Sequence, residues 1–114
     1  MHEMSLVSSM LDIVEEYAAQ HSFGKVNVLK LSFGALSCIE PSALKLSFEV
    51  FSKDTRAEGA RLEYVIHPAT VHCLFCSRDL PVPEYPAVCP ECSSNEVALV
   101  GGFEELRLEE MDVE

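Results

Sequence analysis

Two closely spaced cysteine pairs constrain the fold of this chain more than any other feature. Cys73 and Cys76 form one C-x2-C pair, Cys89 and Cys92 form another, and twelve residues separate the pairs. Four thiolates with this spacing can converge on one tetrahedral metal ion, and a site closed by four thiolates is structural rather than catalytic. The intervening residues are polar and rich in proline, so the metal must supply the folding free energy. We therefore predict a zinc-binding module.

The sequence alone allows other interpretations of the four paired cysteines. Two disulfides or a mononuclear iron site of rubredoxin type would use the same residues, because tetrahedral sulfur ligation suits iron as well as zinc. His72, directly before the first pair, is either an alternative or outer donor to the metal or a solvated linker residue. The fifth cysteine, Cys38, is either a fifth thiol ligand, a reactive nucleophile or a buried, inert thiol, and its apolar to neutral neighbours favour the last. Metal-type spacing with one cysteine left over favours a reducing, cytoplasmic environment.

The charge balance excludes several classes of protein. The chain has 8 basic and 19 acidic residues, for a net charge of −11. A nucleic-acid-binding module needs a basic face for phosphates, but the segment from Cys73 to Cys92 has one arginine, no lysine and three acids. No apolar run approaches the ~20 residues of a membrane span. We expect neither a nucleic acid nor a membrane as partner.

The remaining sequence predicts an α+β fold with two helices and a three-stranded sheet. Helices are predicted over 5–20, with Ser5 as N-cap, and over 41–52, with Glu40 at the N-cap or just before it. Strands are predicted over 25–33 and 61–67, and a third follows the cysteines, where the apolar segments 97–100 and 103–113 flank Gly101 and Gly102. The parity of apolar residues changes between Leu108 and Met111, which indicates either a β-bulge or the end of a strand. The zinc-ribbon-like module then lies between two strands of one sheet, with domain limits of 1–70 plus 97–114 for the α+β domain and 71–96 for the module.

The N-terminus offers a second set of metal donors. The α-amine of Met1, the backbone amide nitrogen of His2 and the His2 imidazole can form fused chelate rings, and such nitrogen donors suit square-planar or tetragonal Ni(II) or Cu(II). Oxygens of Glu3 or Glu40 would complete or expand the ligand set, Glu40 only if the second helix begins beside the first. No nucleophile, phosphate loop or Ser/His/Asp pattern stands out, so we do not expect an enzyme.

Taken together, these features resemble the HypA/HybF family. The chain begins Met-His-Glu-Met-Ser-Leu, carries Leu-Ser-Phe-Gly-Ala-Leu-Ser-Cys-Ile-Glu-Pro at 31–41 and Ala-Glu-Gly-Ala at 57–60, and continues into the two cysteine pairs. The resemblance spans essentially the whole chain. It implies a nickel metallochaperone of [NiFe]-hydrogenase maturation, with a small α+β nickel domain and a zinc-ribbon-like insertion.

The resemblance also implies which residues and partners take part. Nickel is the transient cargo of Met1, His2 and Glu3, with Glu40 as an additional candidate, and zinc is the structural ion of the four cysteines. The implied partners are the GTPase HypB and the hydrogenase large-subunit precursor, and a homodimer stays open. The alternative function is a zinc-ribbon interaction module without a nickel role.

Overall fold

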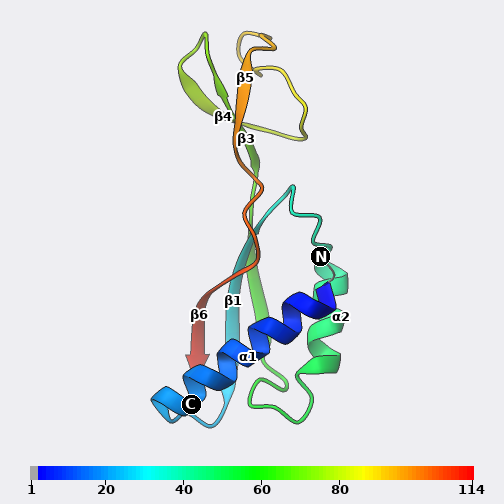
Figure 1. Cartoon of the computed structure of the whole chain (residues 1–114), viewed down its shortest axis with the longest axis vertical. Coiled ribbons are helices and arrows are strands. Elements are labelled where there is room, and N and C mark those ends of the chain that lie inside the picture. The colour runs from blue at the N-terminus through cyan, green and yellow to red at the C-terminus, as the bar shows by residue number, and fades with distance from the viewer. Residues whose placement is uncertain (1–2) are drawn as a thin grey trace. The chain divides into compact units, whose positions relative to one another are not determined.

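The computed structural model describes residues 3–114, which divide into two compact units. Of the described residues, the first unit contains 3–32, 39–65 and 106–114, and the second contains 33–38 and 66–105. Each unit has its own three-stranded sheet, with strand order β2-β1-β6 in the first and β4-β3-β5 in the second (Figure 1). No helix in the described residues is long and apolar enough to span a membrane.

The sheet of the first unit is built around β1 (Val26–Gly34), which lies between β2 (Arg61–His67) and β6 (Arg107–Val113). β1 and β6 are antiparallel, and their register shifts between the pairs Lys30–Glu110 and Leu31–Leu108. Glu109 is the extra residue, and its carboxylate accepts a hydrogen bond of 2.7 Å from the Ser32 hydroxyl. The predicted bulge is therefore confirmed.

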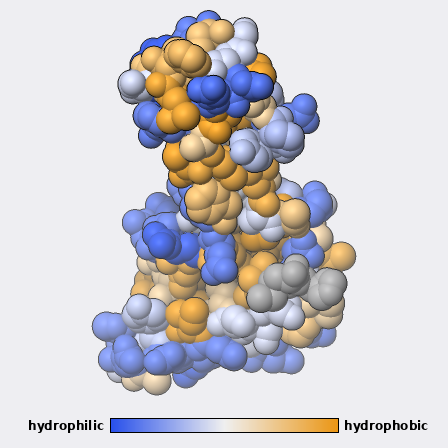
Figure 2. Space-filling model, turned by 45° about the horizontal axis from the view of Figure 1, so that its top comes forward, coloured by the Kyte–Doolittle hydropathy of each residue, from blue (hydrophilic) through white to orange (hydrophobic). Residues whose placement is uncertain are grey.

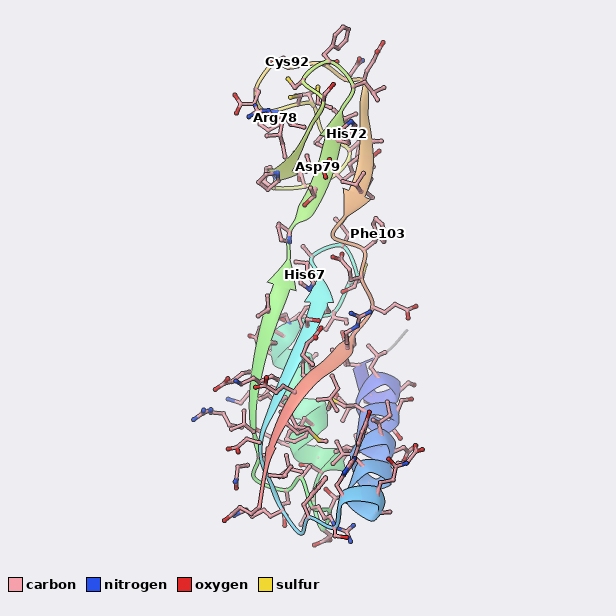
Figure 3. All side chains as sticks on the ribbon, turned by 90° about the vertical axis from the view of Figure 1, so that its left-hand side faces the viewer. His67, His72, Arg78, Asp79, Cys92 and Phe103 are labelled. Atoms are coloured by element: carbon pink, nitrogen blue, oxygen red, sulfur yellow. The ribbon has the colours of Figure 1, made fainter. Side chains whose placement is uncertain are left out.

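Two helices cover one face of this sheet, α1 (Glu3–His21) and α2 (Pro41–Phe51) (Figure 3). Their apolar stripes meet the strands and each other because residues three or four apart share one side of a helix. The core is made of buried side chains from α1, β1 and α2: Val7, Met10, Leu11, Val14, Ala18, Val26, Val28, Leu29, Leu31, Leu44 and Phe48. Tyr17 and Phe51 also belong to the predicted stripes but are partly exposed.

The capping residues predicted from the sequence agree with the structure at α2 but not at α1. Glu40 caps α2 as predicted, since its carboxylate accepts a 2.9 Å hydrogen bond from the Ala43 amide. The predicted N-cap at Ser5 is wrong because α1 is already helical from Glu3. At the other end, Ser22 adopts a left-handed φ of 57°, and its amide donates to the Ala18 carbonyl. That geometry closes the helix before Gly24.

A matched pair of substitutions on α2 tests this packing. Leu44 is fully buried, whereas Leu46 is 62% exposed on the same helix. We expect Leu44→Ala to lower the free energy of unfolding by about 2–5 kcal/mol through lost burial and a residual cavity. Leu46→Ala should change it by less than about 0.5 kcal/mol. Urea denaturation of both variants measures the difference, and equal values would contradict the core assignment.

The second unit contains β3 (Ala69–Cys73), β4 (Arg78–Val82) and β5 (Val97–Gly101). β3 is the central strand, antiparallel to both neighbours, with Cys73 opposite Arg78 on one side and Val97 on the other. The domain limits expected from sequence assigned Val97–Val100 to the larger domain. In the structure this segment pairs with β3 instead, so the compact unit around the cysteines is wider than 71–96.

Two glycines allow a close backbone approach beside this sheet. A Cβ added at Gly34 would overlap the backbone of Gly102 and lie 2.7 Å from the Glu104 amide nitrogen. Gly102 itself has a φ of +100° and passes against the backbone of Ala69. The Leu36 amide donates to the Gly102 carbonyl at 2.6 Å. Glycine is required at both places because no side chain fits between the segments.

Candidate metal sites

Four cysteine sulfurs meet at one point in the second unit. The Sγ atoms of Cys73, Cys76, Cys89 and Cys92 all lie within 4.8 Å of one another. The Cys73–Cys92 and Cys76–Cys89 pairs are 3.6 and 3.9 Å apart. A tetrahedral ion with Zn–S bonds of ~2.3 Å needs sulfur–sulfur distances of about 3.8 Å, whereas a disulfide needs about 2.05 Å. The donor set therefore fits a metal ion, and the disulfide alternative is excluded because all four cysteines are free.

The two cysteine pairs are held by the same local backbone pattern. In the first, the Cys76 amide donates to Cys73 Sγ at 3.4 Å and the Ser77 amide donates to the Cys73 carbonyl. In the second, the Glu91 amide donates to Cys89 Sγ at 3.4 Å and the Ser93 amide donates to the Cys89 carbonyl. Ser77 and Ser93 both have left-handed φ angles, 54° and 63°. These turns aim amide dipoles at sulfur, which stabilises a thiolate.

Because the thiols lie close together, their pKa values differ. Hydrogen bonds with the thiols of Cys92 and Cys73 raise the pKa of Cys76 to about 12. The backbone amides of Cys92 and Glu91 lower the pKa of Cys89 to about 7. Four neighbouring thiols cannot all ionise without a compensating cation, and a bound divalent metal deprotonates them outright. The site is thus built for a cation.

Charged residues around the cluster are paired across elements. His72 faces Asp79 across β3 and β4, with 2.8 Å between His72 Nδ1 and Asp79 Oδ1 (Figure 3). Arg78 and Glu91 form an ion pair of 3.1 Å that links β4 to the second cysteine pair. His72 is therefore a paired strand residue and not a solvated linker. Because the Arg78–Glu91 pair is exposed, it adds little stability by itself.

The fifth cysteine is exposed, so the prediction of a buried thiol was wrong. Cys38 is exposed in the loop that follows the turn after β1, with a left-handed φ of 64°, and its sulfur lies 3.8 Å from the Leu36 carbonyl oxygen. The prediction was wrong because apolar neighbours in sequence do not bury a residue in a surface loop. Cys38 is not part of the four-sulfur cluster.

A second group of donors lies where the two helices of the first unit begin. The Glu40 amide donates a 3.2 Å hydrogen bond to Glu3 Oε2, so the carboxylate of Glu3 sits against the N-cap of α2. The Glu40 carboxylate also accepts from the Ser42 hydroxyl, and this bond, with the Ala43 amide, lowers the pKa of Glu40. The second helix therefore begins beside the start of the first, which is the condition for Glu40 to join a nickel site. Met1 and His2 lie outside the described residues.

Comparison with known proteins identifies the family. A family model described as "Hydrogenase/urease nickel incorporation, metallochaperone, hypA" matches residues 1–113. The chain belongs to the HypA family. It is 54% identical to the hydrogenase maturation factor HypA of Syntrophus aciditrophicus and 41% identical to HypA 2 of Bradyrhizobium diazoefficiens, each over 100% of both chains.

Solved HypA structures share the fold. The solution structure of the Ni metallochaperone HypA from Helicobacter pylori matches with a TM-score of 0.67 and 27% identity, covering 99% of this chain and 97% of that one. A second solution structure of a HypA protein matches with a TM-score of 0.70 and 28% identity, covering 99% and 96%. The predicted α+β fold with its cysteine-bearing insertion is confirmed. The protein is accordingly a nickel metallochaperone of hydrogenase maturation.

Proposed function

We propose that the two donor groups have separate roles, cargo binding at the N-terminus and structural support at the cysteines. Ni(II) is held by the Met1 amine, the backbone amide and imidazole of His2, and Glu3, with Glu40 as a further oxygen donor. Zinc is held by Cys73, Cys76, Cys89 and Cys92. The observation that supports the nickel assignment is the hydrogen bond from the Glu40 amide to Glu3 Oε2, because it holds the start of α2 against the carboxylate of Glu3, the next residue in sequence after Met1 and His2.

The chemistry of the N-terminal donors suits transfer of nickel. Amine, amide and imidazole nitrogens favour Ni(II), and no thiolate takes part that would hold the ion too firmly for release. Glu3 offsets the positive end of α1, which by itself disfavours a cation. Glu40 already caps α2 through Ser42 and Ala43, so it would share its carboxylate between the cap and the metal. Nickel therefore binds to the nitrogen donors of Met1 and His2, and the carboxylates of Glu3 and Glu40 add oxygen donors.

A protein that carries an ion must exchange it with partner proteins, but it need not catalyse a reaction. A metallochaperone role fits a protein that is not an enzyme, and the family description places it in nickel incorporation. The donor and acceptor of the nickel would be the GTPase HypB and the precursor of the [NiFe]-hydrogenase large subunit. These partners, free cysteines and a metal-type thiol site fit the cytoplasm.

Nickel titration of zinc-loaded protein with its native N-terminus tests the proposal. We expect one equivalent of Ni(II) to bind by calorimetry without displacing zinc, whose content is measured before and after by elemental analysis. If nickel binds only by displacing zinc, or does not bind at one equivalent, the separate nickel site is wrong. The zinc-ribbon interaction module without a nickel role would then be favoured.

A further inference from the structure

The outer edge of β2 offers backbone groups for pairing with another strand. In the part of the chain that the structure describes, β2 is an edge strand of its sheet, and β1 is the one strand beside it. It contains no proline, and Tyr64 and Val65 are 44% and 61% exposed. An exposed edge strand of this kind can accept an extended peptide as an additional strand.

A groove runs between this edge strand and α2. We call it the α2–β2 groove, and its volume is about 760 Å³. Its accessible apolar lining comes from Leu62 and Tyr64 of β2, while Leu44 and Phe48 of α2 lie buried at its floor. Leu62 and Tyr64 are two apart and so point to the same face of the sheet, the face that carries the helices. A strand added beside β2 would place every second side chain in this groove.

The charges of the groove select a basic occupant. Glu40, Glu49 and Glu58 supply three carboxylates, against two cations, Lys45 and Arg61. The Arg61 guanidinium is already engaged by Glu63 Oε2, at 3.0 Å from Nε and 2.7 Å from Nη2. The groove is therefore net negative, which favours lysine or arginine in a partner and disfavours acidic segments.

We propose that the α2–β2 groove binds an extended segment of a partner protein that alternates apolar and basic residues and pairs with β2. The apolar residues enter the groove, and the basic residues meet the carboxylates at its rim. Glu40 also lines the groove, and its amide donates to the Glu3 carboxylate, so the bound segment would pass close to Glu3. The binding itself goes beyond the metal roles proposed above and does not depend on them.

A synthetic peptide that alternates lysine and valine is the probe. We expect it to shift backbone amide signals of β2 and α2 in the isotope-labelled, zinc-loaded, nickel-free full chain. The same peptide with every backbone nitrogen methylated should not bind, because it cannot donate hydrogen bonds to a strand edge. Even a weak, transient contact with a Kd of about 1 mM would give detectable shifts at about 1 mM peptide. Absence of shifts at that concentration would overturn the proposal. So would equal binding of the methylated peptide.

Charge-reversal variants test where and why the peptide binds. Glu49→Lys at the groove should weaken binding about tenfold at low salt, whereas Glu16→Lys, an equal change on the exposed side of α1, should not. A peptide alternating glutamate and valine should bind more weakly than its lysine counterpart. Equal effects of the two variants, or equal binding of the two peptides, would overturn the proposal. Concentration-dependent shifts of β2 without peptide would also overturn it, because a second copy of the chain would then be the occupant.

Discussion

In a Cys73→Ser variant we expect the second unit to lose zinc and unfold while the first unit stays folded. Its described core cluster has only three buried members, Ala69, Val71 and Val82, too few to order the strands and long loops around them. A structural zinc ion supplies about 10–16 kcal/mol of apparent binding free energy at neutral pH. Losing one of its four thiolates should therefore remove the main stabilisation of this unit.

Amide hydrogen exchange and zinc analysis measure this outcome. Protection should fall to near zero over β3, β4 and β5 and persist over α1, β1 and α2, with zinc content well below one equivalent. Cys38→Ser is the matched control, since Cys38 is exposed and outside the cluster. It should keep full zinc and native exchange. A Cys73→Ser protein with one zinc and native protection would contradict the four-thiolate site.

Replacing His2 by alanine, or adding one residue before Met1, should abolish tight nickel binding. Removal of an outer partner of a metal ligand already costs about 10–100-fold in affinity, so removal of a ligand should cost more than about 100-fold. The extra residue displaces the α-amine from its chelate ring and should have a similar effect. Zinc content and hydrogen exchange should not change, because the cysteine cluster shares no residue with the N-terminal donors.

Nickel calorimetry at several pH values completes this test. Binding must release protons from the α-amine and the amide, so the affinity of the native protein should rise with pH. The His21→Ala variant, with its imidazole at the far end of α1, is the control and should bind nickel normally. Unchanged one-to-one affinity in His2→Ala would rule out the N-terminal assignment.

Local sequence patterns were informative where short-range physics dominates. The limits of β2, the cap at Glu40 and the bulge near Glu109 followed from alternation, capping chemistry and a change of parity. The patterns failed where a neighbour distant in sequence decides. Val97–Val100 joined β3, which no local signal specifies. Cys38 proved exposed because it lies in the loop that follows the turn after β1.

The sequence by itself determined the chemistry of this protein: four thiols spaced for one metal, nitrogen donors at the N-terminus, and motifs that mark the HypA family. Ligand spacing and residue type are local properties, so they can be read without coordinates. Only the tertiary structure decided which groups meet. It joined Glu3 to Glu40 across 37 positions of sequence, and it left an acidic groove beside an edge strand. Such contacts depend on how helices and strands pack, which residue order does not reveal.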